Sequence, residues 1–229
     1  MAAVEVLAHD PELGVELDAR QRAEARRRAI ARVLHVPEGP WDASTDEPRP
    51  PGHFGLLLLE GVLARDVALG NRMGIELLGP GDLLRPWVRL GNHSSIHLEE
   101  GFLATEPASF AVLDPAFARA IAPWPAIGAA LMDRLALRSR WIAFHLAVCH
   151  LRRVDTRLFV VLWYFGDRWG RVTPEGVRLP VRLTHRLLAG VIGAERSSVS
   201  KAVQTLCRRR KVFRQADGSW VLPGDLPAS

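Results

Sequence analysis

The chain has 229 residues, of which 48% are hydrophobic, and this is enough for two modest domains that each bury a core. Its net charge of +5 is unevenly distributed: residues 151–229 hold 15 Lys and Arg against 6 Asp and Glu (+9), whereas residues 1–150 hold 15 against 19 (−4). Two cysteines, Cys149 and Cys207, are too few for a disulfide framework, and no apolar run reaches membrane-spanning length. The N-terminus lacks the pattern of a secretion signal, so we expect a cytoplasmic protein with no membrane partner.

The stretch from Asp18 to Leu34 is rich in Ala and Arg and predicts a helix. A basic amphipathic helix can bind membranes or nucleic acid, but we expect this one to pack on its own domain. The buried stripe would consist of Ala19, Ala23, Ala29, Ile30 and Val33. The next stretch, Val36 to His53, is rich in Pro and Gly and predicts an irregular loop.

From Phe54 to Asp114 the sequence changes to short apolar or alternating runs that are separated by turn residues. These runs predict strands at Phe54 to Leu59, Val62 to Leu69, Met73 to Leu78, Ser94 to Glu99, Phe102 to Thr105 and Phe110 to Leu113. Because no helical pattern lies between them, they predict an antiparallel roll or barrel. Such a roll is consistent with a sensor of an unknown small-molecule effector, and the residues predict no cofactor.

Two helices are predicted after the roll, a short one at Pro115 to Ile121 and a long one at about Pro125 to His150. The long helix has two apolar stripes and therefore needs two packing partners. We expect these to be the roll and a second copy of the chain, in a homodimer along a helix about 35–40 Å long. A monomer that buries both stripes is the alternative. The stripe assigned to the dimer contact is Ile127, Leu131, Leu135, Ile142 and Leu146.

Residues Leu183 to Leu206 predict a helix-turn-helix. Thr184 can cap the first helix, and Gly193 can adopt the left-handed conformation that a sharp turn requires. The second helix, from about Glu195 to Arg208, places an apolar stripe inward, and its other face carries Arg196, Ser197, Ser200, Lys201, Gln204 and Arg208. Arg, Lys, Ser and Gln side chains can read base edges in a major groove. A plain helical hairpin is the alternative.

The elements around this unit favour a winged helix. A buried helix is predicted at Val154 to Phe165, with short strands at Arg171 to Thr173 and Val177 to Leu179. Two further strands, Val212 to Gln215 and Trp220 to Leu222, flank an Asp-Gly turn at Asp217-Gly218. The positive charge of this part of the chain fits a module that neutralises DNA phosphates.

The order of these elements, ending in an LTxxxLAxxxGxxRxxVSxxxxxL-like segment, resembles the Crp/Fnr superfamily of bacterial transcription regulators over roughly Phe54 to Leu222. The residues that carry the resemblance are Gly61, Gly79 to Asp82, Arg157, Leu183, Thr184, Leu188, Gly193, Arg196, Val199, Ser200, Lys201 and Leu206. It implies a homodimeric regulator with a cyclic-nucleotide-binding-like roll and a C-terminal winged helix.

The resemblance also implies site residues. Those at base-reading positions are Arg196, Ser197, Ser200 and Lys201, and those assigned to phosphates are Thr184, Arg186, Ser198, Gln204 and Arg208. Ser197 stands where many members have a glutamate, so the usual half-site preference is not carried over.

The sensor region departs from the members that bind cyclic nucleotides. Those members have a Gly-Glu pair after the Gly-Asp turn, where this chain has Arg85-Pro86, and an arginine further on, where it has Asn92-His93-Ser94-Ser95. A phosphate buried without a cation is costly, so we do not expect cyclic AMP to bind in the usual way. An altered pocket that uses Arg85 or Arg89 is the alternative.

Metal cofactors known in the superfamily find little support in the residues. Two cysteines cannot hold an iron–sulfur cluster. A haem or metal site at His93 and His97, or at His145, Cys149 and His150, stays open as an alternative. Histidines at this density are more often structural, so we predict no metal site.

No nucleotide-binding or hydrolase motif is present, so we predict no enzyme. The predicted fold class is α+β, with a sensor roll and its N-terminal helix at 1–122, a dimerisation helix at 123–150 and a winged-helix DNA-binding domain at 151–229. We predict a sequence-specific transcription regulator that binds a palindromic operator in double-stranded DNA, with RNA polymerase as a further candidate partner. The alternative is a ligand- or protein-binding roll whose winged helix binds DNA non-specifically or mediates protein contacts.

Overall fold

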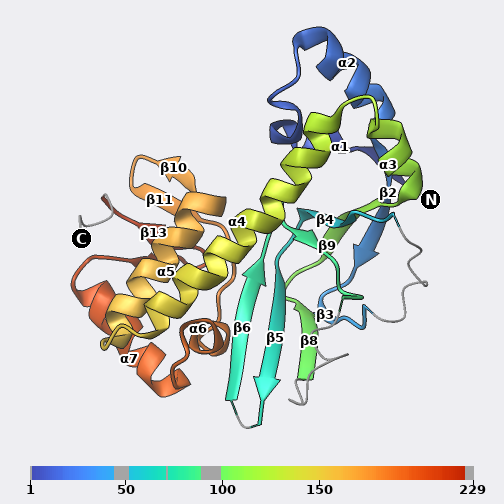
Figure 1. Ribbon diagram of the computed structural model, residues 1–229. Helices are drawn as coiled ribbons and strands as arrows, with labels where there is room; N and C mark the ends of the chain where they lie inside the picture. The colour runs from blue at the N-terminus through green and yellow to red at the C-terminus, as the bar shows by residue number, and fades with distance from the viewer. Residues whose placement is uncertain (1, 44–51, 71, 89–98, 225–229) are drawn as a thin grey trace. The chain divides into compact units, whose positions relative to one another are not determined.

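A computed structural model of the chain describes residues 2–43, 52–70, 72–88 and 99–224 (Figure 1). The chain divides into two compact units, the first formed by residues 1–65 and 77–140 and the second by residues 66–76 and 141–229. Each unit has its own layers and is described separately. Within the described ranges, no helix is both long and apolar enough to cross a membrane.

The N-terminal segment of the first unit is only partly helical. Its elements are β1 (Ala3–Glu5), α1 (Val6–His9), a 3-10 helix (Pro11–Gly14), α2 (Ala19–Arg28) and β2 (Ile30–Val36). Asp18 and Gln21 form a capping box at the start of α2. The prediction of a helix over residues 18–34 is wrong beyond Arg28, because residues 30–36 form a strand that pairs with β1 and β9.

The predicted buried stripe changes accordingly. Ala25 and Ala29 are buried, whereas Ala19, Ala23 and Ile30 are exposed. The helix therefore buries Ala25 and is followed by the buried Ala29, while its arginines are exposed; Val33 is half-buried.

The roll consists of two sheets. The first has the order β1-β2-β9-β4-β7 and the second the order β3-β8-β5-β6. The new strands are β3 (Gly39–Pro40), β4 (Gly55–Glu60), β5 (Leu63–Leu69), β6 (Arg72–Leu78), β7 (Leu83–Leu84), β8 (Glu99–Ala104) and β9 (Ala108–Leu113). Strand β4 lies antiparallel to both β7 and β9, as expected for a roll. Of the strand predicted over residues 94–99, all but Glu99 lies outside the described residues, and the predicted loop over residues 36–53 contains the short β3.

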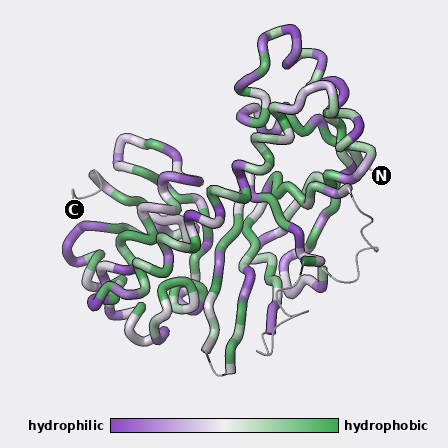
Figure 2. The backbone as a smooth tube through the Cα atoms, in the orientation of Figure 1, coloured by the Kyte–Doolittle hydropathy of each residue, from purple (hydrophilic) through white to green (hydrophobic). Residues whose placement is uncertain are grey.

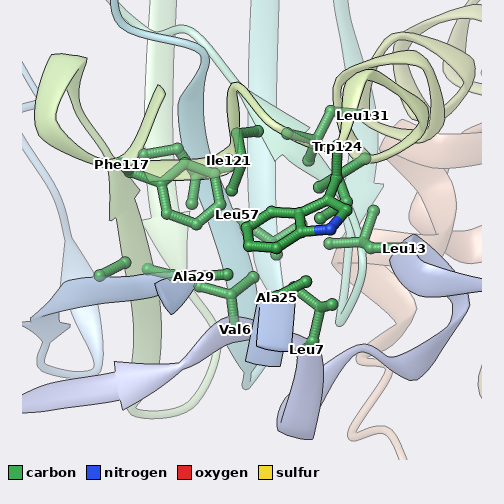
Figure 3. Close-up of a cluster of buried hydrophobic side chains, with 14 of the residues drawn as sticks. Val6, Leu7, Leu13, Ala25, Ala29, Leu57, Phe117, Ile121, Trp124 and Leu131 are labelled. Carbon is green, nitrogen blue, oxygen red and sulfur yellow. The ribbon is translucent and has the colours of Figure 1, made fainter. Parts of the chain in front are cut away.

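The central strand β9 of the first sheet is buried on both faces. Successive side chains of a strand point to opposite sides, so β9 contributes to two separate clusters. On β9, Phe110 and Val112 pack into a cluster with Leu56 and Leu58 of β4. Ala111 and Leu113 point to the other face, into a cluster formed with the N-terminal helices, α3 (Pro115–Ile121) and the start of α4 (Pro125–Cys149). Figure 3 shows this second cluster, with Phe117 of α3 and Trp124 of the turn between α3 and α4 among its side chains. The helices thus form a layer on the outer face of the roll.

The second unit is built around α5 (Val154–Trp169), which packs against both helices of the helix-turn-helix and against two strands of a small sheet. The sheet has the order β10-β11-β13-β12, and its strands are β10 (Arg171–Thr173), β11 (Gly176–Leu179), β12 (Phe213–Arg214) and β13 (Trp220–Leu222). The helices are α6 (His185–Ile192) and α7 (Arg196–Arg208). Leu162, Phe165, Leu188, Val199 and Trp220 are buried in this unit. In Figure 2 most residues of α6 carry the colour of hydrophobic residues, as expected for a helix that contributes five buried residues to a core.

Candidate nucleic-acid interface

The first helix of the helix-turn-helix begins and ends as the sequence predicts. The backbone N–H of Leu187 donates to Oγ1 of Thr184 at 3.2 Å, which caps the start of α6. At the other end Gly193 has φ 60° and ψ 46°, the left-handed conformation that L side chains rarely adopt. The N–H of Ala194 donates to the carbonyl of Ala189, so the turn closes immediately after the glycine.

Arg157 on α5 stabilises the same turn. Its Nε donates to the carbonyl of Leu151 at 2.6 Å, and its NH1 donates to the carbonyls of Ile192 and Gly193 at 3.3 and 3.4 Å. The last two carbonyls belong to the end of α6, where backbone acceptors have no partner within the helix. Arg157 therefore helps to fix the angle at which α7 leaves the turn.

The second helix, α7, has one buried and one exposed face. Val199, Ala202, Val203 and Leu206 are buried, as predicted. Of the predicted base-contacting residues, Arg196, Ser197 and Lys201 are exposed, whereas Ser200 is half-buried. Of the predicted phosphate-contacting residues, Thr184, Arg186, Gln204 and Arg208 are exposed and Ser198 is half-buried.

A cavity of about 440 Å³ lies between the starts of α6 and α7 and strand β12. It is lined by Thr184, His185, Arg186, Arg196 and Arg214. Thr184 and Arg186, which are predicted to contact phosphates, thus line the same cavity as Arg196, which is predicted to contact a base. The sequence reasoning missed His185 and Arg214. Arg214 follows the basic cluster before the wing, but only the fold of the wing brings it to α6.

The wing is closed by a turn around Asp217. The backbone N–H and the hydroxyl of Ser219 donate to Oδ1 of Asp217 at 2.9 and 2.6 Å, and Arg178 donates to Oδ2 at 2.5 Å. The Ser219 hydroxyl, the Ser219 amide and Arg178 together lower the pKa of Asp217 to about 2. The carboxylate is therefore ionised at all physiological pH values and keeps the turn in place.

The residues assigned to the dimer contact have different surroundings on α4. Ile127 and Leu131 are fully buried in the core of the first unit, and Leu135 packs against that core. Ile142 and Leu146 are exposed, at 41% and 62% of their surfaces. The predicted stripe is therefore not one continuous exposed surface.

The candidate metal ligands that the structure describes have different surroundings, and His150 is exposed. Nε2 of His145 donates to the carbonyl of Val191, and Cys149 lies next to Gly193. Burial raises the pKa of the Cys149 thiol, which favours the protonated form. His93 and His97, like Arg89 and the segment 92–95, lie outside the described residues, and within the described ranges no three His, Cys, Asp or Glu side chains are grouped to hold a metal ion.

Comparison with known proteins shows what this fold is similar to. No protein-family model matches the sequence, and no curated protein matches it. Among solved structures, a cyclic nucleotide-binding domain containing protein from Listeria monocytogenes matches with a TM-score of 0.64 and 14% identity, covering 93% of this chain and 96% of that one. FixK2 from Bradyrhizobium japonicum matches with a TM-score of 0.62 and 15% identity, covering 87% and 99%. A transcriptional regulator of the CRP/FNR family from Thermus thermophilus matches with a TM-score of 0.54 and 18% identity, covering 84% and 94%. These matches confirm the predicted α+β fold and, at the level of the fold, the resemblance to the Crp/Fnr superfamily.

Proposed function

We propose, on the premise that the chain has the fold of the Crp/Fnr regulators, that it is a sequence-specific DNA-binding transcription regulator. The observation that carries this proposal is the exposed face of α7, where Arg196, Ser197 and Lys201 stand free of the core. A helix of this shape fits a major groove with its N-terminal residues at the base edges. In this proposal α7 reads bases, residues 1–122 form a sensor, 123–150 a dimerisation helix and 151–229 the DNA-binding domain.

The charged groups around α7 supply affinity for the DNA backbone. Arg186 and Arg214 lie at the cavity beside the start of α7, and Arg208 is exposed at its end. Each phosphate that such a group neutralises releases counterions and contributes about −0.9 to the slope of log K against log salt concentration. We therefore expect strongly salt-dependent binding.

We propose further that two copies pair through α4. One set of exposed positions on this helix recurs at alternating intervals of three and four residues, which is the spacing of a coiled-coil seam. They are Ala129, Met132, Ala136, Ser139, Ala143 and Leu146. This seam replaces the buried Ile127 and Leu131 of the predicted stripe and keeps Leu146. A two-fold axis along it would present two copies of α7 to half-sites about 34–36 Å apart in a palindromic operator.

The roll is proposed to be a divergent sensor that does not bind cyclic AMP in the usual way. The Arg85 side chain is exposed and its guanidinium lies 6.0 Å from the Trp87 ring centroid. Inside the roll, Trp41 stacks on Phe110 with ring centroids 5.4 Å apart. A calorimetric titration with cyclic AMP should show no saturation at micromolar concentrations, and clear micromolar binding would contradict this part of the proposal.

The proposal of DNA binding is tested by fluorescence anisotropy at several salt concentrations. The probes are the DNA upstream of the protein's own coding sequence and a random DNA of equal length. We expect tighter binding to the upstream DNA, and the substitution Lys201→Ala should weaken that binding by about 1–3 kcal/mol if Lys201 contacts a base. Arg27→Ala, which removes the same charge from the exposed face of α2, is the control and should leave both affinities unchanged.

The result of this comparison separates the two functions considered. Equal affinity for both DNAs would contradict a specific regulator and favour a module that binds DNA non-specifically or contacts proteins. An equal loss on both DNAs for Lys201→Ala would show that Lys201 contacts only phosphate.

A further inference from the structure

The cavity beside α7 has the composition of an anion site. Its guanidinium groups come from three separate elements: Arg186 from α6, Arg196 from α7 and Arg214 from β12. No acidic residue is among the described residues that line it. Three cations around one cavity repel one another, and an anion in their midst would relieve this repulsion. Guanidinium groups also match the oxygens of a phosphate geometrically.

The remaining polar group of the cavity is the imidazole of His185. Its Nδ1 lies 2.9 Å from Oγ of Ser200. The hydroxyl of Ser200 donates to the carbonyl of Arg196 at 3.1 Å, and a hydroxyl has one proton to donate. With the Ser200 proton directed to Arg196, Nδ1 of the neutral ring carries the ring proton and donates it to Ser200, and we assign this tautomer from the two contacts.

This tautomer leaves Nε2 of His185 as an unprotonated acceptor. Nε2 is buried and has no hydrogen-bond partner within the described part of the chain. A buried polar atom without a partner is costly, and because His185 lines the cavity, a ligand that reaches Nε2 from there would supply the missing partner. Because the cavity is cationic, the ligand that suits it is an anion, and an anion can accept a hydrogen bond from Nε2 only once that nitrogen is protonated.

The surroundings keep the ring neutral while the cavity holds no anion. Burial, followed by the positive charges of Arg214 and Arg196, lowers the pKa of His185 below its ordinary value of 6.5. The charged groups that line the cavity with the ring are Arg186 on its own helix, Arg196 on α7 and Arg214 on β12, and all three are cations. A phosphate oxygen bonded to the ring would be a negative charge in direct contact with it and would favour the protonated form of His185.

We propose that this cavity is the seat of one backbone phosphate of DNA, and that His185 takes up one proton from solvent at Nε2 as the phosphate enters. The neutral imidazole becomes an imidazolium that donates through Nε2 to a phosphate oxygen and through Nδ1 to Ser200. The proposal rests on the proposed DNA-binding function and adds proton uptake to it. It also assigns Arg196 to the phosphate and leaves base reading to Ser197 and Lys201.

The sign of the resulting pH dependence follows from linkage. The pKa of His185 is lowered in the free protein and is raised by the bound phosphate, so the complex binds more protons than the free protein between these two values. DNA affinity therefore rises as the pH falls through this interval, by at most about tenfold per pH unit for one proton. Outside the interval His185 contributes no pH dependence.

The experiment compares the wild type with His185→Asn at constant ionic strength between about pH 5.5 and 8. The amide N–H of asparagine can still donate to Ser200, but this side chain cannot take up a proton. DNA affinity is measured by anisotropy, and proton uptake by calorimetry in two buffers of different ionisation enthalpy. His150→Gln, at an exposed histidine of the same unit, is the control.

We expect the wild type and His150→Gln to take up as much as one proton more than His185→Asn, whose affinity should depend less on pH. Equal proton uptake by all three proteins would overturn the inference and leave the proposed function intact, whereas failure of the wild type to bind any DNA would overturn both. If His185→Asn does not fold, histidine NMR of the wild type decides: the pKa of His185 should rise when DNA is added, and an unchanged or lower pKa would overturn the inference.

Discussion

The turn between α6 and α7 depends on a backbone conformation that the substitution Gly193→Ala would strain. With φ at 60° and ψ at 46°, Gly193 lies in the left-handed region. A Cβ built there would meet Sγ of Cys149 at 3.7 Å, which is ordinary van der Waals contact. The expected cost is therefore backbone strain alone, about 1–2 kcal/mol, and no steric penalty adds to it.

This cost is measured as the change in the free energy of unfolding from urea titrations followed by tryptophan fluorescence. Gly193→Asn should lose less than Gly193→Ala, because asparagine tolerates the left-handed region better. Gly70→Ala is a matched control at φ 58°, with no neighbouring atom within 4 Å of the added Cβ; it should lose similar stability without affecting DNA binding. A Gly193→Ala protein as stable as the wild type would refute the assigned turn geometry.

Three further predictions concern other parts of the molecule. The pKa of Asp217 is about 2, so the NMR shift of the Ser219 amide proton should change with pH with a midpoint near that value. The ionised carboxylate stabilises the fold above the ordinary pKa of 3.8, and this stability is lost as the pH falls towards about 2. A midpoint near 3.8 would contradict the wing geometry. Arg157→Gln should destabilise the second unit by about 1–3 kcal/mol, since charged hydrogen bonds to three carbonyls are lost; unchanged urea denaturation would contradict this role. Met132→Asp, at a side chain that is 57% exposed, should convert the dimer to monomers in analytical ultracentrifugation while the monomer stays folded, and a persistent dimer would rule out the proposed seam.

The helix-turn-helix was predictable because its signals are local. Thr184 is a capping residue, Gly193 suits a left-handed turn, and the apolar spacing between them and beyond sets both helices. The observed bounds, His185–Ile192 and Arg196–Arg208, therefore lie within one or two residues of the expected ones. The wing likewise follows from its Asp-Gly turn, where Gly218 has φ 87°.

The N-terminal segment was predicted less well, because its structure depends on distant partners. The apolar positions predicted for residues 18–34 continue past Arg28 to Ile30 and Val33, yet Ile30–Val36 forms a strand whose hydrogen bonds go to β9, far along the chain. Pairing with a sheet overrides local helix propensity there.

The phosphate cavity was also hidden from sequence reasoning, for a similar reason. His185 is one histidine among 8 in the chain, and nothing in its immediate neighbours sets it apart. Its partner Ser200 and its cationic neighbour Arg214 come from α7 and β12. Only the folded unit, with α7 and β12 both in place, brings these groups around one ring.

Whether two copies of α7 read a palindromic DNA site can be decided by selecting bound sequences from a random DNA pool with the purified protein. We expect enrichment of one sequence with two inverted half-sites whose centres lie about 10–10.5 base pairs apart. With the Lys201→Ala protein, the enriched sequence should change within both half-sites. If no sequence is enriched, the proposed reading of DNA by α7 is contradicted. It is also contradicted if the enriched sequence stays the same both for Lys201→Ala and for substitutions at Ser197.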